Sequence, residues 1–354
     1  MQPLFRSLLA AAVLFAPLAL ISKGYAESPP PVIRLAGPGN ASGAPYGNGV
    51  FGFMRVKKVL EEEFKAEGTK IDWQFPRGTG PAINEAFANG QLDFSNYGGL
   101  PNIVGRGAGL KTKVLASNGV SPVYVVARKD APISGIQDLK GKKISVSRGT
   151  IYEWSLNRVL STANLNEREL EIFDLQSADQ ISAFSSGHID AIVAGNNLLD
   201  LVDRGLGKVI YTTKGTRGAG TNFGSFVVAE DFARKYQETT QRVVNAFVKT
   251  AYDASQEEHR NEILDAWALT GTPRTAFAKD FDGDALSERL NPLLDDFYVA
   301  NVTSGITFSV NSKLIRRPFK PEEWIDRSYL DKAIKTLGYT GFWRAYDASG
   351  KPNS

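Results

Sequence analysis

The hydrophobic positions of this chain alternate between short apolar runs with strand-like spacing and longer stretches with helical spacing. A short apolar run predicts a buried strand, and apolar residues three or four positions apart predict one face of a helix. The elements predicted in this way are strands at 32–36, 71–75, 143–147 and 171–175, and helices over 51–64, from Pro81, from Thr150 and over 231–267. Strands that alternate with helices favour a largely parallel sheet, so we predict an α/β protein.

One short pattern occurs twice, as AFANGQLD at 86–93 and as AFSSGHID at 183–190. In each copy the Ala-Phe pair predicts the apolar face of a short helix, and the glycine that follows can adopt the left-handed conformation that ends it. A strand follows in both copies and runs to a glycine at the same offset, Gly98 or Gly195. Such units can recur by chance in an α/β protein. Two matched copies far apart nevertheless favour two lobes that face each other across a cleft.

The N-terminus has the pattern of a cleavable export signal. Arg6 precedes an apolar run from Leu8 to Ile21, and the small residues Gly24 and Ala26 follow. We therefore predict a signal peptide over residues 1–26 and a periplasmic location for the mature chain. Removal of this segment changes the formal charge from +3 to about +1, a balance that does not indicate nucleic-acid binding.

The amino-acid composition excludes several kinds of functional site. The chain has no cysteine, which excludes disulfides, a thiol nucleophile, a thiolate metal site and a lipoprotein anchor. Its two histidines, His188 and His259, do not have metal-ligand spacing, and no nucleophile elbow or phosphate-binding loop stands out. We predict that the protein is not an enzyme and uses no cofactor or metal.

Glycine-rich turns between strands and helices offer sites for an anion. Three of them stand out, at 78–81, at 98–99 and at 147–150. The first N–H groups of a helix have no intrahelical partner and lie at the positive end of its dipole, so such turns bind anions where they converge. Thr79 and Thr150 add hydroxyl groups and Arg148 adds a charge, although each turn alone could simply cap its helix.

Three segments carry a resemblance to a known family: FPRGTGPAINEAFANGQLDF at 75–94, IQDLKGKKISVSRGT at 136–150 and WIDRSYL at 324–330. They resemble the solute-binding proteins of ABC importers for aliphatic sulfonates, taurine and nitrate. The resemblance implies a type II periplasmic binding protein-like α/β fold, with two lobes and two hinge crossings. We place the crossings at 121–128 and 223–229, which assigns residues 27–122 and 225–354 to the first lobe and residues 123–224 to the second. The C-terminal helices then belong with the first lobe.

The resemblance also implies ligand contacts. The candidate residues are Pro38, Asn40, Tyr46, Thr79, Gly80, Pro81, Tyr97, Gly98, Gly99, Arg148, Gly149, Thr150, Trp154, Gly195, Asn196, Asn197 and Phe223. Arg148, Thr150 and the turn amides would hold an anionic head, and the aromatic residues would contact the organic part. Many relatives carry an aromatic residue or an Asp-Pro pair at the strand end of the second lobe, where this chain has AGNN at 194–197. Two amides favour a ligand with a polar tail over simple nitrate.

These observations predict a monomeric substrate-binding protein that delivers a small organic anion, such as a sulfonate, to an inner-membrane permease. Two alternatives remain open at this point. One is an enzyme on the same fold, of the type that makes the pyrimidine precursor of thiamine, which the absence of cysteine disfavours. The other is a periplasmic sensor subunit that passes ligand to a membrane kinase.

Overall fold

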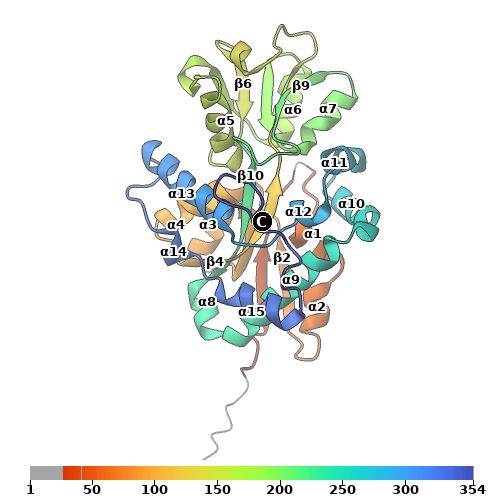
Figure 1. The fold of residues 1–354 in the computed structure, drawn as a ribbon, viewed down its shortest axis with the longest axis vertical. Coiled ribbons are helices and arrows are strands. Elements are labelled where there is room, and N and C mark those ends of the chain that lie inside the picture. The colour runs from red at the N-terminus through yellow and green to blue at the C-terminus, as the bar shows by residue number, and fades with distance from the viewer. Residues whose placement is uncertain (1–26, 41, 354) are drawn as a thin grey trace, which may run out of the picture.

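The computed structural model describes residues 27–40 and 42–353, which form two lobes built on two five-stranded sheets (Figure 1). The predicted signal peptide lies outside these residues. The first sheet has the order β2 (Lys70–Gln74), β1 (Val32–Ala36), β3 (Phe94–Gly98), β10 (Asn222–Ala229), β4 (Thr112–Ser121). The second has the order β7 (Glu171–Asp174), β6 (Lys143–Val146), β8 (Ala191–Ala194), β5 (Tyr124–Arg128), β9 (Gly207–Thr212).

The two sheets have the same mixed topology. Three strands of each sheet pair in parallel, and one strand that is out of sequence order, β10 or β5, runs antiparallel to both of its neighbours. The chain passes from β4 to β5 through residues 122–123 and returns through residues 213–221. The return crossing predicted at 223–229 is therefore wrong in position. Those residues are almost fully buried between β3 and β4, so they form a central strand of the first sheet.

Helices cover both sheets. Those that begin before the return crossing are α1 (Gly49–Val56), α2 (Val59–Glu63), α3 (Thr79–Ala88), α4 (Gly99–Gly107), α5 (Ile151–Ser161), α6 (Ser177–Ser185) and α7 (Leu199–Asp203), with 3-10 helices at Ile136–Leu139, Glu167–Glu169 and Asn196–Leu198. Those that follow it are α8 (Glu230–Lys235), α9 (Gln237–Ala254), α10 (Arg260–Ala268), α11 (Arg274–Phe281), α12 (Leu286–Arg289), α13 (Asp296–Asn311), α14 (Pro321–Trp324) and α15 (Ser328–Leu337), with a 3-10 helix at Glu257–His259.

Three of the predicted helices differ in their bounds. The helix predicted over 231–267 is divided into α8, α9, a 3-10 helix and α10. The helix predicted over 51–64 is divided into α1 and α2 because Lys58 adopts a left-handed conformation with φ of 54°. The helix predicted from Pro81 begins two residues earlier, at Thr79. Apolar periodicity does not register a single left-handed residue, so this break is invisible in the pattern.

The sequence repeat has the predicted structure in both lobes. Gly90 and Gly187 end their helices with φ of 66° and 82°. Each repeat also ends in an aspartate with the same role: Asp93 accepts a hydrogen bond from the N–H of Arg34 (2.8 Å), and Asp190 accepts one from the N–H of Lys143 (2.9 Å). Because each N–H belongs to the neighbouring parallel strand, the two aspartates tie equivalent strands together. The repeat is thus one unit used once in each lobe.

Helix α11 contacts the cores of both lobes. Ala276 is fully buried in the apolar cluster that covers one face of the second sheet. On the same helix, Phe277 and Phe281 pack against Trp267 in the first-lobe core, and Lys279 forms an ion pair with Asp203 of α7. The lobes are therefore joined by this helix as well as by the two crossings.

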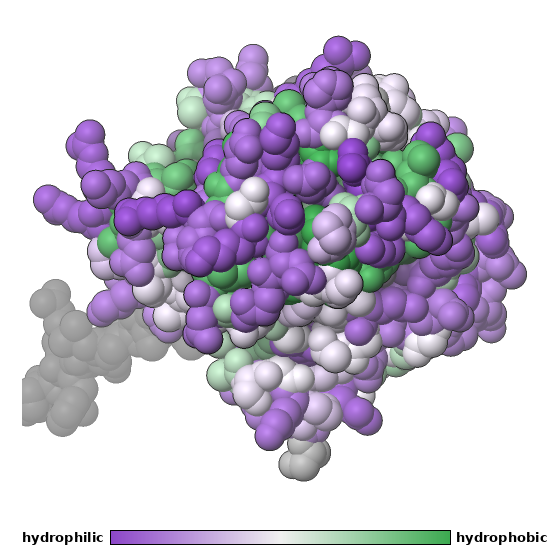
Figure 2. Space-filling model, turned by 90° about the horizontal axis from the view of Figure 1, so that it is seen from above, coloured by the Kyte–Doolittle hydropathy of each residue, from purple (hydrophilic) through white to green (hydrophobic). Residues whose placement is uncertain are grey.

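The outer surface offers few apolar residues. Seen from the end that carries the second lobe, it is mostly hydrophilic, with small and interrupted apolar areas (Figure 2). Among the described residues, the exposed large apolar side chains are Val209, Leu269 and Leu314. No helix in the described part of the chain is both long and apolar enough to cross a bilayer.

Candidate functional site

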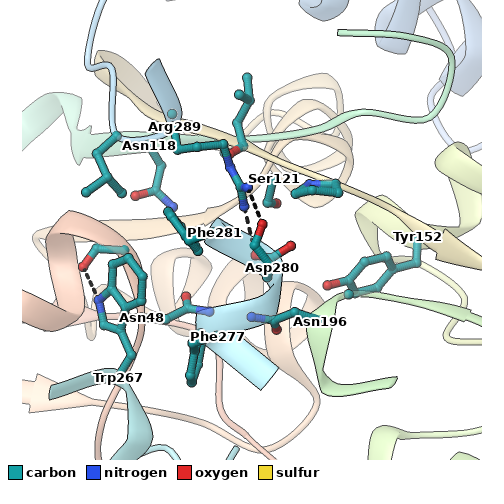
Figure 3. A pocket seen from close by; sticks show the side chains of 17 residues that line it. Asn48, Asn118, Ser121, Tyr152, Asn196, Trp267, Phe277, Asp280, Phe281 and Arg289 are labelled. Carbon is teal, nitrogen blue, oxygen red and sulfur yellow. Dashed lines mark hydrogen bonds and ion pairs between the residues drawn. The ribbon is translucent and has the colours of Figure 1, made fainter. Parts of the chain in front are cut away.

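A cavity of about 100 Å³ lies between the two lobes, beside the first crossing (Figure 3). The first lobe contributes the start of α1 and the end of β4 to its lining, and the second lobe contributes Tyr152 of α5 and the turn after β8. Helices α10, α11 and α12 and strand β10 also contribute. The lining therefore combines segments that are more than two hundred residues apart in the sequence.

Three asparagine side chains give the cavity its polar character. Asn48 stands at the N-cap of α1 without capping it through its side chain, so its amide is available to a ligand. Asn118 at the end of β4 has a buried amide oxygen with no hydrogen-bond partner among the described residues. Asn196 faces them from the second lobe (Figure 3). The first N–H groups of α1 lie beside these amides, so this end of the cavity is rich in hydrogen-bond donors and also holds one unpaired acceptor, the Asn118 oxygen.

A buried network of charged and hydroxyl groups supports another wall, to which it contributes Asp280 and Arg289. Arg289 of α12 donates to the Asp280 carboxylate of α11 (2.8 Å), to Asp284 (2.6 Å) and to the carbonyl of Val120 (3.1 Å). Tyr124 of β5 donates its hydroxyl to the other Asp280 oxygen (2.7 Å). The side chains of Arg289 and Asp280 are 7% and 4% exposed, so this ion pair is largely shielded from water. The network links the second sheet to the C-terminal helices.

Aromatic residues complete the lining. Trp267, Phe277 and Phe281 pack together on the first-lobe side, and Trp267 donates its indole N–H to the carbonyl of Gly49 (3.0 Å). Tyr152 extends from the opposite lobe (Figure 3). Burial, with a smaller contribution from the negative charge of Asp280, raises the pKa of Tyr152 to about 12. Its hydroxyl therefore keeps its proton at neutral pH and can donate a hydrogen bond.

Of the residues predicted from the sequence, Gly195 and Asn196 line this cavity. Gly195 lets the hydroxyl of Tyr152 approach closely, because a Cβ at that position would lie 2.5 Å from it. The neighbouring Asn197 turns toward Ser177 instead, at 3.4 Å. The strand end of the second lobe thus contributes one of its two predicted amides to the lining of the cavity.

The predicted glycine turns pack against protein. A Cβ at Gly80 would clash with Pro101, and one at Gly99 would clash with the ring of Phe223. Across the lobes, Gly98 lies against Ile151 and Gly149 against Pro81, both at 3.3 Å from a Cβ placed there. Thr79 has a strained φ of 52°, and its buried hydroxyl has no partner among the described residues. The turns converge as predicted, but they meet one another rather than the cavity.

The predicted aromatic contacts belong largely to the core. Tyr97, Trp154 and Phe223 are 2%, 2% and 4% exposed, and Tyr97 donates its hydroxyl to Asn84 (2.8 Å). Burial raises the pKa of Tyr97 far above its usual value. Trp154 of α5 packs edge-on against Phe223 of the first sheet, so the contact between the lobes buries both rings.

The loop after β1 holds the three remaining N-terminal candidates. Asn40 organises it by donating its amide to the carbonyls of Ala44 and Tyr46, both at 2.9 Å. The ring of Tyr46 stacks under the guanidinium of Arg55 at 5.3 Å, and Pro38 is exposed. None of these three side chains lines the cavity.

Arg148 and Thr150 have structural partners. The Arg148 guanidinium donates to Glu153 (2.5 Å) and to Glu167 (3.0 Å). Thr150 caps α5 by accepting from the N–H of Tyr152 (3.2 Å), and it donates to the carbonyl of Ser147 (2.7 Å). Because these two carboxylates already neutralise its positive charge, Arg148 does not attract a further anion.

Replacement of Arg148 by alanine is therefore expected to lower stability by about 1 kcal/mol, because its ion pairs are partly exposed. Ligand affinity is expected to stay the same. Thermal denaturation with and without ligand measures both quantities. A variant that keeps its melting temperature but loses ligand binding would restore the anion-binding role.

Sequence reasoning missed most of the lining, including Asn48, Asn118, Trp267, Asp280 and Arg289. One signal was present: Asn48 and Asn118 each precede a glycine, and Asn196 follows one. Three asparagines next to glycines indicate polar groups on backbone that can be approached closely. Neither histidine lines the cavity, and the described residues contain no cluster of histidine and acidic side chains suited to a metal.

Comparison with known proteins shows which family the chain belongs to. The model of a family described as NMT1/THI5 like matches residues 64–259. A Bacillus subtilis protein named as an aliphatic sulfonates-binding protein is 26% identical over 293 residues, which are 79% of this chain and 83% of that protein. The taurine-binding periplasmic protein of Escherichia coli is 31% identical over 207 residues, which are 57% of this chain and 61% of that protein.

Solved structures agree with the fold. The periplasmic sulfonate-binding protein SsuA of Methylobacillus flagellatus has a TM-score of 0.79 at 26% identity, and the match covers 91% of this chain and 99% of that one. The desulfurization enzyme DszB has a TM-score of 0.63 at 17% identity, covering 86% of this chain and 99% of that one, and shows the fold alone. The predicted two-lobed α/β fold is thus confirmed.

Proposed function

Because the chain belongs to the NMT1/THI5-like family, we propose that it is the substrate-binding component of an ABC importer and that it binds a small organosulfonate between its lobes. The names of its relatives, which include sulfonate-binding and taurine-binding periplasmic proteins, support this function. A single structural observation carries the site: a small, polar cavity is lined by both lobes at their junction. The partner in this proposal is an inner-membrane permease.

We assign the sulfonate group to the donor-rich end of the cavity. The amides of Asn48, Asn118 and Asn196 and the first N–H groups of α1 supply neutral donors there. Neutral dipoles at a helix N-terminus suit a monoanion of a strong acid, which needs hydrogen bonds more than a counter-charge. The apolar wall of Trp267 and Phe281 then faces the hydrocarbon part of the ligand.

We propose binding rather than catalysis. The curated relatives are named as binding proteins, and the cavity lining combines amides, aromatic rings and one paired carboxylate. The chain has no cysteine, and neither histidine reaches the cavity. A role as a sensor subunit uses the same site, so it differs from transport in the partner and not in the ligand.

We also propose that the lobes close on the ligand. Residues 27–122 and 222–353 form the first lobe and residues 123–221 the second, which moves the return boundary to the start of β10. Two crossings, at residues 122–123 and 213–221, permit a hinge motion. Small-angle scattering is expected to show a smaller radius of gyration at saturating ligand.

The mature chain is expected to begin at Glu27, after cleavage behind Ala26. Glu27 holds the N-terminus against α9: its carboxylate accepts hydrogen bonds from the N–H groups of Glu238 and Thr239 at 3.0 and 2.9 Å. These groups lie at the start of α9, where a negative charge is favourable. N-terminal sequencing of periplasmic protein tests the cleavage site, and an uncleaved chain would contradict the proposed location.

The direct test of the function is calorimetric titration of the purified mature chain with ethanesulfonate, taurine, nitrate and acetate. Binding of at least one sulfonate in preference to nitrate and acetate is expected. Replacement of Asn196 by alanine is expected to weaken that binding about tenfold through loss of a hydrogen bond to a charged group. The matched variant Asn197→Ala, whose side chain points toward Ser177, is expected to bind normally.

A further inference from the structure

The cavity lining holds one carboxylate, that of Asp280, whose cation is shared with a second carboxylate outside the lining, although the proposed ligand is an anion. Arg289 is the one cationic side chain among its lining residues, and its guanidinium donates to both Asp280 (2.8 Å) and Asp284 (2.6 Å). One positive charge therefore faces two carboxylates. Because nearby like charges disfavour each other most where water is scarce, a ligand with a second negative group is opposed here.

Asp280 is placed to contact a ligand. Its carboxylate lines the cavity and lies between Arg289 and the hydroxyl end of Tyr152 (Figure 3). One oxygen accepts from Tyr124 (2.7 Å) and the other from Arg289. A carboxylate oxygen has two lone pairs, so each oxygen keeps capacity for a further donor. A ligand that fills the cavity meets an acceptor at this wall.

Another part of the lining has the complementary chemistry. The amides of Asn48 and Asn118 and the start of α1 supply donors for the sulfonate. The whole cavity measures about 100 Å³, so a short ligand reaches the donors and Asp280 at once. A methyl group against Asp280 would leave the carboxylate desolvated without a new partner, and a carboxylate there would add repulsion.

We propose that Asp280 makes this protein selective for organosulfonates whose second end carries a hydrogen-bond donor, an ammonium or a hydroxyl group. The inference rests on the proposed sulfonate-binding function. Asp280 is the specificity-determining residue in it, and Arg289 and Tyr124 hold its carboxylate in place.

The test uses four sulfonates with the same two-carbon length and different second ends: taurine (ammonium), isethionate (hydroxyl), ethanesulfonate (methyl) and sulfoacetate (carboxylate). Their affinities for the unmutated mature chain are measured by calorimetry at neutral pH. Taurine and isethionate are expected to bind about tenfold or more tightly than ethanesulfonate, since each adds a hydrogen bond to a charged group. Sulfoacetate is expected to bind most weakly.

Two matched variants assign the effect to one carboxylate. Asp280→Asn is expected to remove most of the advantage of taurine over ethanesulfonate and to improve sulfoacetate binding. Asp284→Asn removes an equal charge from the same arginine but does not line the cavity, so it is expected to keep the preference for taurine.

The outcomes separate the two proposals. Equal affinity for ethanesulfonate and taurine in the unmutated protein overturns the role of Asp280 while leaving the sulfonate function intact. Binding of none of the four sulfonates overturns the proposed function and this inference together. If Asp280→Asn does not fold, the ligand series on the unmutated chain still decides.

Discussion

Replacement of Trp154 by alanine is expected to lower the free energy of unfolding by about 3 to 5 kcal/mol, as for other fully buried large aromatic residues. The Trp154 ring lies edge-on to Phe223 with centroids 5.7 Å apart, and the guanidinium of Arg158 stacks on it at 4.8 Å. Because α5 belongs to the second lobe and Phe223 to the first, the void would open at the contact between them. Denaturant unfolding followed by circular dichroism measures the loss.

Two comparisons sharpen this prediction. Trp154→Phe keeps a ring in the same space and is expected to lose less than half as much stability. The sequence had suggested Trp154 as a ligand contact, which predicts the opposite behaviour. A variant that unfolds normally but no longer binds sulfonates would show that the sequence interpretation was right.

Replacement of Arg289 by methionine is expected to destabilise the protein by about 3 to 5 kcal/mol. The change leaves the buried carboxylate of Asp280 without its cation and removes a hydrogen bond to the carbonyl of Val120 at the first crossing. The penalty comes mainly from the uncompensated charge. Denaturant unfolding at neutral pH measures it.

The matched control is Arg242→Met. Arg242 also pairs with two carboxylates, those of Glu63 and Glu67, but it lies at the surface with 30% of its side chain exposed. Exposed pairs contribute little, so a loss of about 1 kcal/mol or less is expected. If the two variants lost equal stability, burial would not be the cause of the effect at Arg289.

Local features of the fold were predictable because they depend on neighbours in the sequence. The repeat is the clearest case: Gly90 and Gly187 both have the left-handed conformation, and a strand follows each. The N-cap at Thr150 is another, since capping needs one hydroxyl at the right position. Such signals act over a few residues and remain visible in the pattern.

The candidate site was less predictable because it depends on contacts between distant segments. Asn48, Asn118 and Asp280 come together only when α1, β4 and α11 are packed, and nothing near Asp280 in the sequence marks it as a cavity residue. Arg148 shows the converse. Its neighbouring glycine suggested an anion site, but its guanidinium is already paired with Glu153 and Glu167. A lone arginine in a turn does not reveal which carboxylates will reach it.

The position of α11 has a consequence for the kinetics of ligand exchange. Ala276 is buried with the second lobe, while Phe277 and Phe281 are buried with the first. Before water or solute can enter the cavity, this helix has to separate from one of the two apolar surfaces. This separation adds an energy barrier that a hinge made of the two crossings alone would not have. We therefore expect association rates well below those of free diffusion and long residence times. Affinity in this protein would then be governed by slow release.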